Sequence, residues 1–408
     1  MSHSFALRAT VLAVACVLSQ AAAAKHPPPA TADTIRVRQQ FFGAENVNAR
    51  TGEVDKQKVI FSWTTNASYA VSIRGRIVLL DTYVHRGETV PGRTPFVVED
   101  LVTLRPEAIF LGHGHGDHAD NAAFVAGRLG IPIYASEETC DAMQVDAANL
   151  DAAGIIDVPS VDCHDVTSAG STPGAEIVNI PQLEPDACIT AFRHLHSTTT
   201  PLDTSMPIAP VINDADPRDA TVYNGNPPMY PPGTPHSFPT SGGPGGPISI
   251  FYQFVVRGGN RFTFAWHNTT GALKEGCGID KCWGPAVGQH LTDIMHALPQ
   301  TDVELGSSVS LGFPVNGMRD VVLYNEALLP KIYIPIHQTN AALPTSSLRF
   351  KIAYLQQLTQ MVPPFPAELR PEARWMVDPD DFLKPLVYDP KSDRWDKPKQ
   401  HGTVGSCG

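Results

Sequence analysis

Three histidines and one aspartate lie within residues 113–118, in the segment GHGHGDHADN. His113 and His115 are two residues apart with glycines interleaved, and Asp117 and His118 follow directly. Because glycine adopts turn conformations that other residues avoid, both imidazoles can point at one ion, and the aspartate and third histidine can reach a second. Imidazole together with carboxylate suits borderline metals such as zinc. The segment therefore predicts a metal site, which a buried core or a solvated surface would not explain.

The elements around this segment are expected to hold it between a strand and a helix. Residues 108–111 form an apolar run that stops at Gly112, and residues 121–129 have the apolar spacing of a helix. Residues 131–135 then return as a strand. This β-loop-α-β order is typical of a layered α/β fold.

Strand-like segments on both sides extend the pattern. The predicted upstream strands, which resemble a small β-meander ending at Asp81, are 58–63, 69–73 and 77–80. The predicted downstream elements are strands at 248–256, 261–266 and 332–336 and a helix at 320–329. The second half of the chain thus repeats the strand and helix order of the first.

The HxHxDH run resembles the signature of the metallo-β-lactamase fold superfamily, and the resemblance extends over residues 59–340. The upstream segment NASYAVSIRGRIVLLDTY is similar to the strand-turn-strand-aspartate element of that superfamily, particularly of its lactonase-like and phospholipase D-like hydrolases. The resemblance implies an α/β fold, a four-layer αβ/βα sandwich, here with a Pro/Gly-rich insertion. Asp81 fits the aspartate of the upstream element, whose role in the family is supportive; capping of nearby amides is an equal alternative.

The resemblance also implies further ligands after later strands. The segment ACITAFRHLHST offers two histidines, of which His196 is favoured because the family's ligand precedes a small residue, while His194 stays a competitor. The segment IYIPIHQTN resembles the closing strand of the family and gives His337 as a ligand of the second ion.

One family element departs from the pattern. Where the family has a strand ending in Gly-Asp, with a carboxylate that bridges two metals, this chain has FTFAWHNTTG, and His267 occupies the place of the aspartate. A neutral imidazole has one lone pair and cannot bridge. The site is then expected to hold two less tightly linked ions or one firmly bound ion, with His267 ligating one of them. Asn268 is no substitute, because a neutral amide is a poor zinc ligand.

The predicted function is that of a metal-dependent hydrolase acting on a small-molecule substrate. A metal-bound hydroxide is the expected nucleophile, with Asp117 as the catalytic residue that orients it and relays a proton, and the bond cleaved is an ester, lactone, amide or phosphodiester. The expected cofactor is zinc, as one or two ions, with iron or manganese as alternatives. A β-lactamase, an iron-dependent oxidoreductase and a non-catalytic metal-binding protein are the alternative functions. The candidate metal ligands are His113, His115, Asp117, His118, His196, His267 and His337, with His194 as the alternative.

Composition limits the partners and the organisation. The 408 residues carry a formal net charge of -11, which argues against nucleic acid or an anionic membrane as a partner. The expected organisation is a signal peptide at 1–24, an N-terminal extension at 25–57, a hydrolase domain at 58–345, and a C-terminal extension at 346–408 packed on that domain. Within the domain, the Pro- and Gly-rich segment 197–247 is expected to be an inserted loop, either solvent-exposed or a lid over the site. Nothing in the sequence specifies an oligomeric state.

The N-terminal residues and the cysteines point to export. Arg8 precedes an apolar stretch that ends in three alanines, which predicts cleavage after Ala24. The purely apolar run 11–18 is too short for a membrane span, which needs about 20 residues. The predicted location is therefore periplasmic or secreted. Six cysteines remain after the leader, so up to three disulfide bonds are possible; Cys277 with Cys282 and Cys140 with Cys163 are candidate pairs.

Overall fold

The computed structural model describes residues 30–84, 96–199, 246–258, 262–308, 311–338, 343–376, 381–395 and 407. The expected signal peptide at 1–24 lies outside these residues, as does most of the expected inserted loop at 197–247. Within the described part of the chain, no helix is both long enough and apolar enough to cross a membrane.

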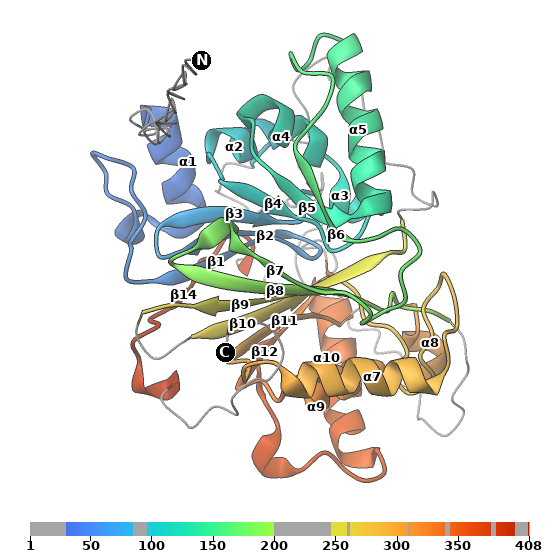
Figure 1. Cartoon of the computed structure of the whole chain (residues 1–408). Coiled ribbons are helices and arrows are strands. Elements are labelled where there is room, and N and C mark those ends of the chain that lie inside the picture. Colours follow the sequence, from blue (N-terminus) through green and yellow to red (C-terminus); the bar gives the residue numbers. More distant parts are fainter. Residues whose placement is uncertain are drawn as a thin grey trace, which may run out of the picture.

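Two seven-stranded mixed sheets stack face to face in the centre of the molecule (Figure 1). The first sheet, in spatial order, is β14 (Leu386–Tyr388), β1 (Val59–Thr65), β2 (Ser68–Ile73), β3 (Arg76–Leu80), β4 (Ala108–Phe110), β5 (Ile133–Ser136) and β6 (Cys163–Thr167). The second is β13 (Glu372–Ala373), β12 (Ile332–Ile336), β11 (Val303–Ser307), β10 (Thr263–His267), β9 (Ser249–Val256), β8 (Ala187–His194) and β7 (Ile177–Ile180).

Helices cover the outer face of each sheet (Figure 1). Those of the first half are α1 (Ala32–Phe42), α2 (Val98–Thr103), α3 (Gly116–Ala119), α4 (Ala122–Leu129) and α5 (Glu137–Ala152). Those of the second half are α7 (Pro285–Ala297), α8 (Phe313–Asn316), α9 (Arg319–Leu328) and α10 (Leu343–Gln360). Short 3-10 turns lie at Ala44–Asn46, Pro181–Leu183, Ala367–Leu369 and Asp393–Trp395. This helix-sheet-sheet-helix order confirms the predicted four-layer αβ/βα sandwich.

Aromatic side chains fill the space between the two sheets. Phe61 of β1 meets Phe264 of β10 edge to face, with ring centroids 4.9 Å apart, and Phe110 of β4 meets Phe254 of β9 at 5.3 Å. Every residue of β1 is buried, because the strand is covered on both faces. Such packing holds the two sheets in one relative position, and the ends of strands from both sheets can therefore build a single site.

The segments before and after the central domain pack against it or add strands to its two sheets. Phe41 of α1 packs against Phe96 with centroids 5.4 Å apart. In the C-terminal segment, β14 pairs antiparallel with β1, and β13 pairs parallel with β12.

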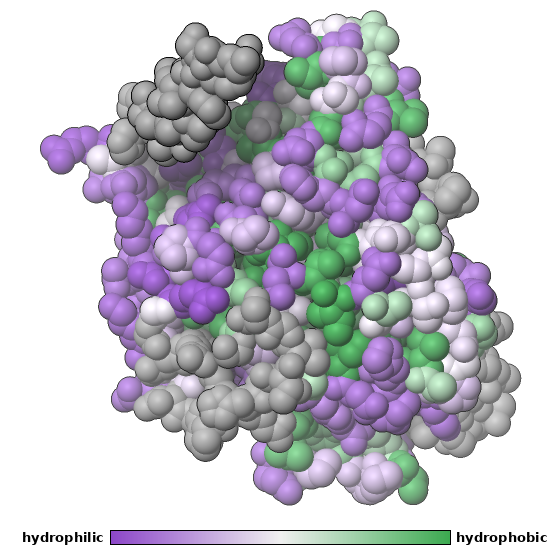
Figure 2. All heavy atoms as spheres, viewed as in Figure 1, coloured by the Kyte–Doolittle hydropathy of each residue, from purple (hydrophilic) through white to green (hydrophobic). Residues whose placement is uncertain are grey.

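On the face shown in Figure 2, hydrophilic residues predominate at the surface, and hydrophobic residues are visible near the middle.

Three disulfide bonds join the six cysteines that follow the expected leader. They are Cys140–Cys163, Cys188–Cys407 and Cys277–Cys282. The first and third are the two candidate pairs expected from the sequence. The second connects β8 to a residue 219 positions later, so it attaches the C-terminal segment to the second sheet.

Candidate metal centre

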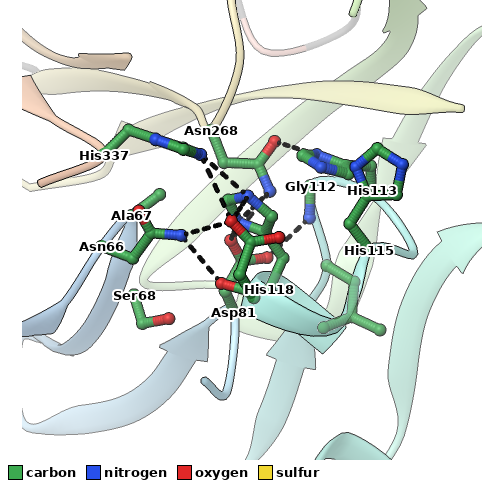
Figure 3. Close-up of polar contacts among 12 residues, drawn as sticks. Asn66, Ala67, Ser68, Asp81, Gly112, His113, His115, His118, Asn268 and His337 are labelled. Atoms are coloured by element: carbon green, nitrogen blue, oxygen red, sulfur yellow. Dashed lines mark hydrogen bonds and ion pairs between the residues drawn. The ribbon is translucent and has the colours of Figure 1, made fainter. Parts of the chain in front are cut away.

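The HxHxDH segment turns sharply as it leaves the first sheet. Strand β4 ends at Phe110, and α3 begins at Gly116 with His115 as its N-cap residue. His113 and His115 therefore precede the helix, and Asp117 lies in its first turn. Gly112 is required by close packing, because a Cβ atom there would lie 2.2 Å from the side chain of Asn268. The short turn brings the imidazoles and the carboxylate to one end of the sheet (Figure 3).

His113, His115 and His196 form the first set of converging donor atoms, named here the three-histidine group. One donor atom from each lies within 4.8 Å of the other two. His196 Nε2 lies 3.2 Å from His115 Nδ1. Zinc ligands at about 2.0–2.1 Å in tetrahedral geometry lie about 3.3 Å apart, so this spacing fits a zinc ion.

Hydrogen bonds on the far side of the rings fix which nitrogen faces the centre of this group. His113 Nδ1 donates to Asn268 Oδ1 at 2.8 Å, and His196 Nδ1 donates to the Ser197 carbonyl oxygen at 2.8 Å. Each ring therefore turns the lone pair of its Nε2 inward. His113 Nε2 is buried and has no hydrogen-bond partner among the described residues. A buried polar atom without a partner is costly, and a bound cation would satisfy it.

The electrostatics of this group keep its rings neutral. Burial lowers the pKa of His113 well below its ordinary value, and the neighbouring histidines lower it further. Burial likewise lowers the pKa of His196 to about 3. Since a metal binds the neutral imidazole, both ligands are ready to bind at neutral pH without first losing a proton.

Asp117, His118 and His337 form a second set, named here the aspartate group. His118 Nε2 lies 3.2 Å from His337 Nε2, and Asp117 Oδ2 lies 3.4 and 3.6 Å from these two nitrogens. Burial raises the pKa of Asp117, but the charges of the nearby histidines and a hydrogen bond from Asn66 outweigh it and lower the pKa to about 2. Its carboxylate is thus ionised, and 46% of the side chain is exposed. This group is the more open of the two.

Asp81 and Asn268 connect the two groups from behind (Figure 3). Asp81 Oδ1 accepts from the Gly112 amide at 2.9 Å, and its Oδ2 accepts from His118 Nδ1 at 2.7 Å. Asn268 Nδ2 donates to the same Oδ2 of Asp81 at 2.8 Å, and Asn268 Oδ1 accepts from His113 Nδ1. Asp81 therefore combines both expected roles, because it caps an amide and supports a ligand. Both ends of the Asn268 amide are already engaged in orienting ligands.

The structure places His267, predicted from the sequence as a metal ligand, outside both donor groups. Its Nδ1 faces the Thr269 carbonyl oxygen at 3.0 Å, and its Nε2 faces Glu304 Oε1 at 2.9 Å. Both ring nitrogens thus meet oxygen atoms, which leaves no lone pair for an ion. The ring is also stacked between Phe251 and Tyr324. Because β10 ends at His267, the next residue, Asn268, is the one that points into the site.

The structure places His196, and not His194, in the three-histidine group. His194 is the last residue of β8, and its Nδ1 lies 3.0 Å from the hydroxyl of Tyr324. His196 lies two residues beyond the strand end, where the regular alternation of side chains no longer applies. His194 belongs instead with His267, whose ring centroid is 5.8 Å from its own.

Several supporting residues were not identified from the sequence. Glu304 is fully buried inside β11, and its spacing gave no signal. Asn66 was noticeable only as the start of an N-x-S pattern. Asn268 had a usable signal, since it directly follows His267, the residue aligned with the family's bridging aspartate, but its amide argued against it as a ligand.

No protein-family model and no curated protein matches the chain. Several solved structures are similar to it at low identity. Igni18, a metallo hydrolase from Ignicoccus hospitalis, is 12% identical over 81% of this chain and 98% of its own, with a TM-score of 0.44. Zinc-bound PqqB from Methylobacterium extorquens is 11% identical over 85% and 90%, with a TM-score of 0.40. CmlA, a diiron β-hydroxylase from Streptomyces venezuelae, is 9% identical over 83% and 55%, with a TM-score of 0.39.

Sheet order and helix layers form the four-layer αβ/βα sandwich that the resemblance to the metallo-β-lactamase fold implies, and the structure brings the histidine-rich segment into one site. Its two donor groups supply five imidazoles and one carboxylate, which suits zinc and also other transition metals. The site can hold a metal ion.

Proposed function

We propose that the chain is a metal-dependent hydrolase that holds two zinc ions, one in each donor group. The observation that carries this proposal is the convergence of two sets of three donor atoms, in which hydrogen bonds fix the opposite side of three of the five rings, those of His113, His118 and His196. Zinc bound in such a site lowers the pKa of a coordinated water toward about 7 and polarises a carbonyl or phosphoryl oxygen.

The residues of the chain divide the work of binding and proton transfer. In the three-histidine group, His113 and His196 are buried and His115 is half-buried, so the group serves mainly to hold an ion. Asp117 is partly exposed and ionised, so its carboxylate can orient a water molecule and accept its proton. Asp81 accepts a hydrogen bond from His118 Nδ1, so the Nε2 of His118 keeps its lone pair and faces Asp117 and His337. Hydrolysis of an ester, lactone, amide or phosphodiester is the class of reaction that this arrangement serves.

The test is metal analysis of the purified protein combined with a panel of chromogenic esters, lactones, phosphodiesters and a cephalosporin. We expect zinc and a turnover that a chelator abolishes and added zinc restores. Hydrolysis of the cephalosporin in preference to the others would identify the β-lactamase alternative. Metal-free protein with undiminished hydrolysis would contradict the proposal.

A second candidate function rests on the aspartate group. Two histidines and one carboxylate are also the donor set of non-haem iron oxygenases. An iron-dependent oxidoreductase is therefore the alternative from another class. Iron as the copurifying metal, oxygen consumption and no hydrolysis of any ester would favour it.

The alternative of a non-catalytic metal-binding protein rests on the missing bridging carboxylate, since His267 faces Thr269 and Glu304 and its neighbour Asn268 is an amide. The partly exposed carboxylate of Asp117 favours a hydrolase instead. Hydrolytic turnover that depends on Asp117 would exclude this alternative.

We further propose that the protein is exported to the periplasm or secreted. Three disulfide bonds support an oxidising compartment. Fractionation of the producing cells, with mass spectrometry of the mature N-terminus, tests this; intact protein retained with its thiols reduced in the cytoplasm would contradict it.

A further inference from the structure

We propose that Asn66 is a positioning residue that fixes Asp117 and His337 relative to each other and thereby sets the affinity for the ion in the aspartate group. This inference rests on the proposed metal-dependent function. Asn66 lies in the turn between β1 and β2, and it contacts ligands from both halves of the sandwich (Figure 3).

The first contact is with the carboxylate ligand. Asn66 Nδ2 donates to the backbone oxygen of Asp117 at 2.9 Å and to its side-chain Oδ2 at 3.0 Å. Oδ2 is also the atom that lies closest to the nitrogens of His118 and His337. Because nearly half of the Asp117 side chain is exposed, packing does not fix its orientation, and this hydrogen bond does.

The second contact is with the histidine ligand of the other sheet. The backbone oxygen of Asn66 accepts from the His337 amide at 3.0 Å, and Asn66 forms an isolated antiparallel bridge with Gln338. His337 follows the end of β12 with a φ of 72°. A non-glycine residue in this region must be held there by its surroundings, and the Asn66 carbonyl provides such a restraint.

The turn that carries Asn66 is itself rigid. Its φ of 48° is in the left-handed region, which asparagine tolerates better than most residues. Trp63 Nε1 donates to the Asn66 carbonyl at 3.0 Å, and Trp266 Nε1 donates to the Ala67 carbonyl at 3.1 Å. Two buried indoles, one from each sheet, thus fix the backbone from which Asn66 reaches both ligands.

The most informative variant is Asn66→Gly, which permits the left-handed backbone and removes only the amide side chain. Zinc is titrated into metal-free protein by calorimetry, for the wild type and the variant. We expect the wild type to bind two ions. The variant should bind the second ion, the one in the aspartate group, about 10- to 100-fold more weakly, while its affinity for the first ion, in the three-histidine group, is unchanged. Ser68→Ala is the matched control, because this buried hydroxyl at the start of β2, two residues from Asn66, has no hydrogen-bond partner among the described residues.

A second variant, Asn66→Asp, keeps the size of the side chain and replaces the donor by an acceptor that faces Asp117. This variant is also expected to bind the second ion more weakly. Tighter binding of that ion would contradict a role for the hydrogen bond that Asn66 donates to Asp117. Substitution with cobalt gives a readout independent of turnover, since the visible absorption of the second ion should change in both variants.

Three results would overturn the proposal. One is an unchanged affinity for the second ion in folded Asn66→Gly. Another is an equal loss for both ions together with a lower Tm, which would indicate a general structural role. The third is a wild type that binds only one ion. A wild type that binds none would instead contradict the proposed function itself, so the two failures are distinguishable.

Discussion

Two histidine clusters lie side by side in this protein, and they differ in what their nitrogens face. In the buried pair, His194 precedes the site residue His196 by two positions, and His267 directly precedes the site residue Asn268. In the metal centre, hydrogen bonds engage one nitrogen of each supported ring and turn the other toward a common point. In the buried pair, both nitrogens of His267 meet oxygen atoms. Residue type and proximity along the chain are therefore poor guides to ligation at His267, where both ring nitrogens already have an oxygen partner.

The largest effect is expected from the exposed side of the metal centre. Asp117→Asn should lower hydrolytic kcat by about 10²- to 10⁴-fold, because it removes the group that orients water and accepts its proton. The Tm of the metal-free variant should change little, since the side chain is partly exposed. Steady-state kinetics and thermal unfolding check this. Retention of most of the activity would remove Asp117 from the account.

The buried pair should respond in the opposite way. His267→Leu leaves Oε1 of the fully buried Glu304 carboxylate without its histidine partner, while Oε2 still accepts from Asn325, and the loss is expected to cost about 3 kcal/mol of unfolding free energy. The folded fraction should still bind two ions. Denaturant unfolding with metal analysis measures both quantities. Unchanged stability together with the loss of one ion would restore His267 as a ligand and break the comparison.

The sequence predicted the layers of the fold and much of the site. The HxHxDH segment was recognisable because its candidate ligands lie within six residues, whereas His196 and His337 were predicted from the resemblance to a known family. The failure at His267 has a physical reason: a one-residue shift at the end of β10 exchanges the side chain that enters the core for the one that enters the site. Helices such as α5, and buried partners such as Glu304, depend on contacts between distant segments that periodicity does not encode.

A smaller effect is expected where the two donor groups are connected. Asn268→Asp replaces the amide donor, 2.8 Å from Asp81 Oδ2, by a second carboxylate. Repulsion should displace Asp81 and its partner His118, and zinc affinity should fall about 10-fold. Competition with a chromogenic chelator measures this. Tighter zinc binding would instead mean that a carboxylate here bridges the ions.

The smallest effect is expected at His194. His194→Phe removes the hydrogen bond between His194 Nδ1 and the hydroxyl of Tyr324, so it should change the unfolding free energy by about 1 kcal/mol. Two ions should remain bound. A lost ion in this variant would show that His194, rather than His196, completes the three-histidine group.

The most direct test of the two-group account is the zinc stoichiometry of three proteins measured side by side by equilibrium titration of the metal-free form. We expect two ions for the wild type and one each for His196→Ala and His337→Ala, because each variant removes a ligand of a different group. Unchanged stoichiometry in both variants, or the loss of both ions in either one, would contradict the division of the site into two independent donor groups.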